Sequence, residues 1–125
     1  MKSDFLKCSV CGNIVEKING INDVICCNNL MQPITANSVD AAFEKHIPVI
    51  EEKDNHVTIT VGSILHPMEE KHYIQWIYLK TTKGNYRFSL NPGDIPQVEI
   101  TLSKSEKILL TYAYCNIHGL WVSNE

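Results

Sequence analysis

The cysteines of this chain fall into two groups that differ in their spacing and in the chemistry they favour. Cys8, Cys11, Cys26 and Cys27 lie in the first quarter of the chain, and Cys115 stands alone near the end. Four thiols within twenty residues favour a closed tetrahedral metal site. The lone thiol precedes a histidine by three residues, which indicates a second site with ligands from elsewhere in the chain. Two metal sites of different chemistry indicate a redox function.

The first group combines a Cys-x-x-Cys turn with two adjacent cysteines. The turn from Cys8 to Cys11 brings two sulfurs to one edge of an ion. Neighbouring side chains of an extended strand point to opposite faces, so Cys26 and Cys27 can share that ion only through a bend. Disulfides are disfavoured, because a bridge between adjacent cysteines is strained and cytoplasmic thiols stay reduced. Such a Cys₄ set accepts zinc and iron alike, so these residues leave the metal's identity open.

The second constellation is formed by histidines around Cys115. One of the five histidines, His56, begins a polar strand and fits an ordinary surface histidine. The other four each lie at a turn or at a strand end, where one rim of a β-sandwich could gather them; they are His46, His66, His72 and His118. Four neutral imidazoles and one thiolate leave one of six octahedral positions open for a ligand. The alternative is a buried strand cysteine with scattered histidines.

The composition limits the classes of function. The chain has 125 residues, of which 44% are hydrophobic and 20% are charged, as in a soluble globular protein. Its formal net charge of −3 gives no sign of a positively charged surface for binding nucleic acid. No apolar run reaches membrane-spanning length, and the start lacks the apolar region of a signal peptide. We therefore expect a cytoplasmic protein that binds neither nucleic acid nor membrane.

The elements that must position these residues are mainly β-strands. Residues 1–36 hold too few large apolar side chains to fold without a metal or a partner. Residues 32–38 are typical of a linker, and residues 39–45 could form a short helical turn. Short strands with regular turns then predict an immunoglobulin-like antiparallel sandwich over residues 37–125. The expected strands cover residues 57–61, 72–80, 86–90, 98–102, 108–115 and 120–122.

Four segments, in this order, resemble the desulfoferrodoxins, the two-iron class of superoxide reductase. The resemblance covers essentially the whole chain, although the loop from Cys11 to Cys26 is one residue shorter than the family pattern. The segments are Cys8–Cys11 with Cys26–Cys27, Glu44–Glu51, His66–Ile77 and Cys115–Trp121. No single segment is decisive, but the four together are very hard to obtain by chance.

The resemblance implies a role for each candidate residue. It implies a desulforedoxin-like iron domain over residues 1–36 and a superoxide reductase domain over residues 37–125. The first iron would be held by Cys8, Cys11, Cys26 and Cys27. The second would have His46, His66, His72 and His118 in its equatorial plane and Cys115 as its axial ligand. Glu44 matches the glutamate that takes the sixth position in the oxidised resting state, and Lys45 matches the lysine beside the open ferrous site.

The activity that this resemblance implies is the one-electron reduction of superoxide to hydrogen peroxide at the ferrous site. An external donor, a rubredoxin-like protein in keeping with the family, would re-reduce the iron, and the family usually forms homodimers. Two other functions fit the same residues. One is a pure electron-transfer iron protein, which would need no open coordination position. The other is a zinc-stapled binding module, which would be colourless because zinc thiolates do not absorb visible light.

Overall fold

The computed structural model describes residues 2–123, and the chain divides between Ser38 and Val39 into two compact units. The predicted domain boundary, between residues 36 and 37, lies two positions earlier. The regular secondary structure of both units is antiparallel strand, apart from one short helix, α1 (Phe43–His46), which is described in the second. The predicted mainly β fold is therefore confirmed.

The first unit is a small three-stranded sheet with a separate hairpin. The sheet has β1 between β2 and β5, and the hairpin joins β3 to β4. These strands are β1 (Lys2–Lys7), β2 (Ile14–Glu16), β3 (Ile25–Cys26), β4 (Asn29–Leu30) and β5 (Gln32–Thr35). Leu6, Cys8 and Met31 form its small buried cluster. So small a core agrees with the expectation that this segment needs a metal or a partner for stability.

The predicted linker over residues 32–38 is wrong in its first half. Residues 32–35 form β5, which pairs antiparallel with β1. Pro33 in this segment suggested a break, because proline cannot donate a hydrogen bond to a sheet. It is tolerated here because β5 lies at the edge of its sheet, where one side of the strand makes no ladder.

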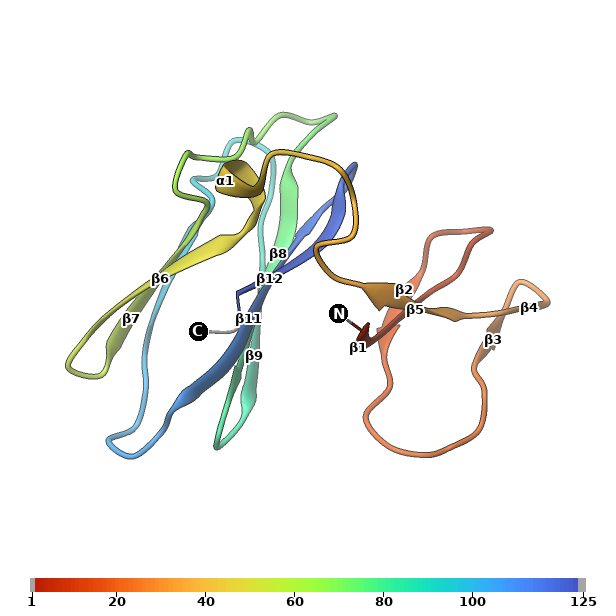
Figure 1. Ribbon diagram of the computed structural model, residues 1–125, viewed down its shortest axis with the longest axis horizontal. Helices are drawn as coiled ribbons and strands as arrows, with labels where there is room; N and C mark the ends of the chain where they lie inside the picture. The colour runs from red at the N-terminus through yellow and green to blue at the C-terminus, as the bar shows by residue number, and fades with distance from the viewer. Residues whose placement is uncertain (1, 124–125) are drawn as a thin grey trace. The chain divides into compact units, whose positions relative to one another are not determined.

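The second unit is a sandwich of two antiparallel sheets (Figure 1). One sheet has the order β10-β7-β6 and the other has the order β12-β11-β8-β9. The strands are β6 (Pro48–Lys53), β7 (His56–Val61), β8 (Ile74–Thr81), β9 (Asn85–Ser89), β10 (Gln97–Thr101), β11 (Ile108–Cys115) and β12 (Gly119–Ser123). All six strands predicted for this unit are present, with ends that differ by at most two residues. The predicted sandwich is confirmed.

The core of the sandwich follows from the alternation of apolar residues. Val57, Ile59 and Val61 of β7 are fully buried, whereas the threonines between them are half-buried. They pack against side chains of β8 and β11, the two central strands of the other sheet. Cys115, the last residue of β11, belongs to this same buried cluster. The strand that ends at the lone thiol is thus anchored in the core.

One strand of this unit, β6, was not predicted. It pairs with β7 through a two-residue turn, Asp54-Asn55, in which Asp54 has a φ of 57°. Turns of this length join strands readily when their residues adopt positive φ, as Asp and Asn do. The residues of β6 beyond Pro48 are half-buried or exposed, because the strand lies at the edge of its sheet. The strand therefore carries too weak an apolar pattern to be recognised alone.

Three connections meet at one end of the sandwich (Figure 1). They are α1, the segment between β7 and β8, and the turn between β11 and β12. Gly62 brings the second of these against the first. A Cβ atom there would lie 2.6 Å from the carbonyl oxygen of Glu44 and 3.0 Å from that of Ile47. Only glycine permits so close an approach, which is fixed by a hydrogen bond of 3.0 Å from the Ile64 N–H to the Glu44 carbonyl.

Candidate metal centres

The four N-terminal cysteines converge on one point of the first unit. Their sulfur atoms all lie within 4.8 Å of one another, and all four are free thiols. Cys11 Sγ is 3.6 Å from Cys26 Sγ, which is 3.9 Å from Cys27 Sγ. A tetrahedral ion with bonds of about 2.3 Å separates its sulfurs by roughly 3.8 Å. The thiols are therefore spaced for a tetrahedral metal ion and are too far apart for disulfides.

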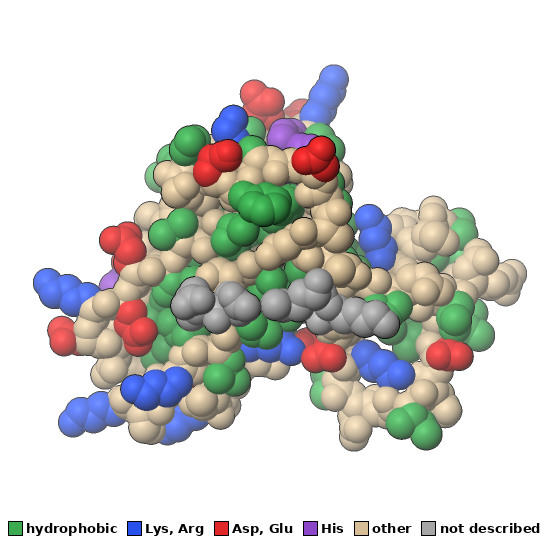
Figure 2. Space-filling view, viewed as in Figure 1, with side chains coloured by type: hydrophobic (Ala, Val, Ile, Leu, Met, Phe, Trp, Pro, Cys, Tyr) green, Lys and Arg blue, Asp and Glu red, His purple; other side chains and the backbone are tan. Residues whose placement is uncertain are grey.

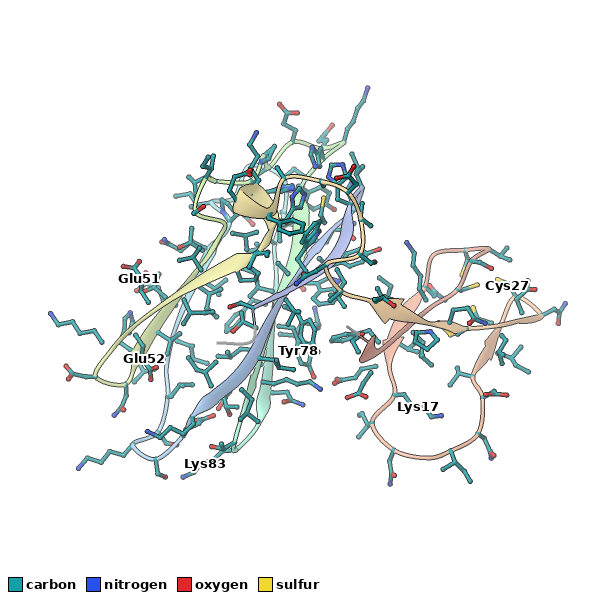
Figure 3. The ribbon with its side chains drawn as sticks, in the orientation of Figure 1. Lys17, Cys27, Glu51, Glu52, Tyr78 and Lys83 are labelled. Atoms are coloured by element: carbon teal, nitrogen blue, oxygen red, sulfur yellow. The ribbon has the colours of Figure 1, made fainter. Side chains whose placement is uncertain are left out.

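Local backbone geometry explains how adjacent cysteines can share one site. Cys27 and Asn28 have φ values of 52° and 60°, and they form the two-residue turn between β3 and β4. Two successive positive φ values are typical of a type I′ hairpin turn. This turn is the bend that the sequence required, and it leaves Cys27 at the tip of the hairpin (Figure 3).

The electrostatics of this cluster favour a cation. Backbone hydrogen bonds from the Cys11 and Val10 N–H groups lower the pKa of Cys8 to about 6. Hydrogen bonding to the Cys11 sulfur raises the pKa values of both Cys26 and Cys27, that of Cys27 to about 12. One thiolate is thus stabilised by the protein, and further ones would repel it. A bound cation supplies the charge that lets all four deprotonate.

The second cluster lies at the loop end of the sandwich. The ligand atoms of His46, His66, His72 and Cys115 all lie within 4.8 Å of one another. The fifth predicted member, His118, adjoins them, with its Nδ1 3.1 Å from His46 Nε2 and 4.0 Å from Cys115 Sγ. The helix α1 supplies one of these residues, the β7–β8 connection two, and β11 with its following turn the other two. Figure 2 shows histidine at the surface of this end, among acidic and basic side chains.

The imidazoles of His46 and His66 face each other in an arrangement that needs a cation between them. His46 Nδ1 lies 2.7 Å from the Ala42 carbonyl, and His66 Nδ1 lies 2.6 Å from the Pro67 carbonyl. Carbonyls only accept, so each Nδ1 carries the proton of a neutral ring. The two Nε2 atoms, 3.2 Å apart, then face each other with lone pairs. Two nitrogens bound at right angles to one ion at about 2.1 Å are roughly 3.0 Å apart, so a metal fits this arrangement.

Burial supports the same conclusion for the remaining groups. His72 Nε2 is a buried nitrogen without any hydrogen-bond partner among the described residues, as expected of a ligand atom that points at an ion. Desolvation lowers the pKa values of His46 and His72, and that of His66 to about 4. These rings therefore stay neutral and able to bind metal near neutral pH.

The lone thiol is held in the core and receives a hydrogen bond from the chain. Cys115 is fully buried, and the His118 N–H donates to its sulfur at 3.4 Å. Burial raises the pKa of Cys115, so the thiolate needs a cation beside it. A soft sulfur with several imidazoles is a donor set that suits iron, copper or zinc rather than magnesium or calcium.

The two predicted reactive residues, Glu44 and Lys45, lie on α1 directly before His46. Both side chains are exposed. Burial is the largest cause of the lowered His72 pKa, and the positive charge of Lys45 lowers it further. The negative charge of Glu44 opposes the lowering at His46. The electrostatic fields of both side chains thus reach the histidine cluster.

His56, which we expected to be an ordinary surface residue, lies apart from the cluster. Its side chain is half exposed, and its Nε2 is 2.7 Å from Glu99 Oε1 on the neighbouring strand β10. This contact is a cross-strand pair on the outer face of the sheet.

One residue that contacts the cluster was missed at the level of sequence. The indole of Trp121 is fully buried and stacks on the His46 ring, with centroids 4.8 Å apart and planes inclined by 29°. Its Nε1 donates to the His118 carbonyl at 3.2 Å. The edge of Phe43 completes the packing, with ring centroids 5.4 Å apart. A tryptophan three positions beyond a predicted ligand looks like any core residue in the sequence, so only the structure assigns it this contact.

Fold and sites together define a protein class: a Cys₄ metal module followed by an antiparallel sandwich that carries a histidine–cysteine metal centre. Two family models match the chain, "Desulfoferrodoxin, N-terminal domain" over residues 1–34 and "Desulfoferrodoxin" over residues 38–124. The chain belongs to the desulfoferrodoxin family, as its sequence predicted.

Individual relatives agree with this assignment. The chain is 50% identical over 116 residues to the desulfoferrodoxin of Desulfarculus baarsii, covering 92% of this chain and 90% of that one. It is 38% identical over 104 residues to the superoxide reductase of Pyrococcus abyssi, covering 70% and 90% respectively. The crystal structure of the superoxide reductase from Treponema pallidum matches with a TM-score of 0.79 and 34% identity, covering 98% of both chains.

The described residues include no helix with the length and apolar character that crossing a bilayer demands.

Proposed function

We propose that this protein is a superoxide reductase, an oxidoreductase that converts superoxide to hydrogen peroxide. The observation that carries the proposal is the convergence of His46, His66, His72 and Cys115, with His118 beside them, at one end of the sandwich. Relatives that bear the name superoxide reductase match it in sequence and in structure. Reduction of one superoxide consumes one electron and two protons and yields one hydrogen peroxide.

We further propose that both sites hold iron and that residues 1–36 and 37–125 are the two functional domains. The four N-terminal cysteines would bind the first iron as a tetrahedral thiolate set. The second would be bound by His46, His66, His72, His118 and Cys115. Iron held by these residues would supply the electron for superoxide and an open coordination position for the anion.

The chain's own residues would prepare the site for an anionic substrate. Four imidazoles that bind as neutral ligands add no charge, so a divalent ion with one thiolate would leave the centre net positive. Lys45 adds a positive charge that attracts superoxide and offsets the charge of the reduced product, although the whole protein is acidic. The Cys115 thiolate would donate electron density to the metal that it holds, which would favour protonation and release of the peroxide. Glu44 would close the open position in the oxidised resting state.

The partners and setting are also proposed. The site needs one electron per turnover, and a rubredoxin-like protein of the same compartment would deliver it. Free cysteines in a metal-binding arrangement suit the reducing cytoplasm. By likeness to its family, the protein would act as a homodimer in the detoxification of superoxide under oxidative stress.

The test is the yield of hydrogen peroxide per superoxide consumed, with anaerobically reduced protein and a continuous electron donor. A reductase gives one peroxide for each superoxide and consumes one electron from the donor. One peroxide for every two superoxides, with no donor consumed, means dismutation or an inert protein, and it would exclude the proposed reaction. Metal analysis and the visible spectrum distinguish iron from zinc in each site.

A further inference from the structure

His72 differs from the other imidazoles of the cluster in how it is held. The rings of His46 and His66 are each fixed by a hydrogen bond from Nδ1 to a carbonyl oxygen. Within residues 2–123, the ring of His72 makes no hydrogen bond, and its Nε2 is buried without a partner. A metal ligand normally has a second group that orients its ring. Apart from its ring contacts with His66 and His118, whose centroids lie 4.6 and 5.1 Å away, the orientation of His72 therefore depends on its backbone.

The backbone on both sides of His72 is bound by one side chain, that of Asn116. Its Nδ2 donates to the Lys71 carbonyl at 3.0 Å, and its Oδ1 accepts from the Tyr73 N–H at 3.0 Å. The backbone N–H of Asn116 also donates to the Tyr73 carbonyl, at 3.2 Å. The peptide groups that flank His72 are thus tied to a single residue.

The other polar groups of these two peptide units, the N–H and the carbonyl of His72, are used within a tight turn. Both groups bond to Glu69, each at 3.0 Å. This turn closes residues 69–72 but binds them to nothing else through these groups. Asn116 therefore provides the hydrogen bonds that link the turn to the rest of the site.

Asn116 is well placed to couple ligands, because it lies between two of them in the chain. It directly follows Cys115 and precedes His118 by two residues. A register shift between β8 and β11 lies at the same point, where Cys115 pairs with Ile74 although Tyr114 pairs with Trp76. Irregularities of this kind redirect a strand end and often occur beside active sites. Beyond the shift, Asn116 continues the pairing by binding Tyr73.

We propose that Asn116 is a positioning residue that clamps the His72 loop to the Cys115–His118 turn and so sets the place of the His72 ring in the metal site. The inference rests on the assignment of this cluster as a metal site. It does not depend on the reaction that the metal carries out. An amide side chain is required, because one group must donate to a carbonyl while the other accepts from an N–H.

The test uses the full-length protein loaded with Fe²⁺ and challenged with a graded series of a chelator such as EDTA. Iron retained per chain is measured together with the visible absorption of each site. Asn116→Ala removes both side-chain bonds, and loss of such an outer partner typically weakens metal binding by about 10–100-fold. We expect that loss in the histidine–cysteine site alone, with the Cys₄ site of the same chain unchanged as an internal reference.

Two further variants separate positioning from general damage. Asn116→Asp keeps the acceptor for Tyr73 and loses the donor to Lys71, so we expect a smaller loss and a shifted ferric absorption band. Asn91→Ala changes an asparagine in an exposed turn and should retain iron like the wild type. Lys71→Ala removes only a side chain and leaves the bonded carbonyl, so it too should retain iron.

Three outcomes would overturn the inference. The first is an iron affinity of the Asn116→Ala site within twofold of wild type, and the second is an equal loss in Asn91→Ala. The third is a loss of thermal stability that is as large in the metal-free variant as in the metal-loaded one, since that indicates a purely structural role. If Asn116→Ala does not fold, unchanged affinity and spectrum in Asn116→Asp refute the clamp. If the wild type takes no metal into this site, the proposed function fails instead.

Discussion

Replacing Gly62 by alanine tests how tightly the site depends on the contact between two loops. The new Cβ atom would lie 2.6 Å from the Glu44 carbonyl oxygen, whereas ordinary contact begins at 3.4 Å. The obstacle is backbone on both sides, so no side chain can rotate away. The helix α1 or the β7–β8 connection must therefore move by about 0.8 Å, the difference between those distances.

The displacement has two calculable effects. Overpacking of this kind costs typically about 1–3 kcal/mol, and a domain of this size loses roughly 4–8 °C in Tm for each kcal/mol. We therefore expect Tm to fall by at least about 4 °C. Since α1 ends in His46, the same shift moves a proposed ligand, and a displacement near 1 Å can reduce a catalytic rate by about 10²-fold.

The assay combines thermal unfolding, the visible spectrum of the ferric site and the rate constant with superoxide. The matched control is Gly84→Ala, at a turn glycine whose added Cβ would meet nothing closer than 3.9 Å. It should leave the spectrum and the rate unchanged. If Gly62→Ala shows the wild-type Tm within about 1 °C together with the wild-type spectrum, the close approach of the two loops does not constrain the site, and the reasoning is refuted.

Three other perturbations have definite expected results. Trp121→Leu should lower the free energy of unfolding by about 3 kcal/mol and broaden the ferric absorption bands. Trp121→Phe keeps an aromatic ring on His46 and should lower the stability less. An equal loss of stability for both variants in thermal unfolding would contradict the stacking role. Glu106 accepts hydrogen bonds from Thr81 and Tyr86, which lower its pKa to about 2, so its carboxylate stabilises the fold fully above pH 4.5. That stability is lost as the pH falls from 4.5 towards 2, and the difference in Tm between wild type and Glu106→Gln should shrink over this window; a constant difference would contradict it. Cys27→Ser should release metal from the first site and leave the absorption of the second intact, and iron retained at two per chain would count against the tetrahedral set.

Much of the fold and the sites could be predicted from the sequence because several signals are local. The alternation of Val57, Ile59 and Val61 depends only on the period of a strand, and it located β7. The Cys-x-x-Cys spacing is likewise set by the geometry of one turn. The histidines were assigned to a common rim because each lies at a turn or strand end, and the structure brings them to one end of the sandwich.

The features that were missed depend on contacts between distant segments. Nothing near Pro33 in the sequence reveals that its segment pairs with β1 and forms the edge strand of the sheet. Asn116 looks like an ordinary turn residue until Lys71 and Tyr73, more than forty positions away, are seen to bond to it. Gly62 is required by the carbonyl of Glu44, which belongs to a different loop. Local pattern cannot report requirements that tertiary contacts impose.

The place of Cys115 in the buried core has a consequence for the rate at which the second site can lose its metal. A sulfur that packs among fully buried side chains of β8 and β7 can move away from the site only when that core opens. The lifetime of the loaded centre should then follow the slow opening rate of the central strands, as amide hydrogen exchange along β11 would report. Loss of the metal would then accompany unfolding of the sandwich core rather than exchange with free metal ions.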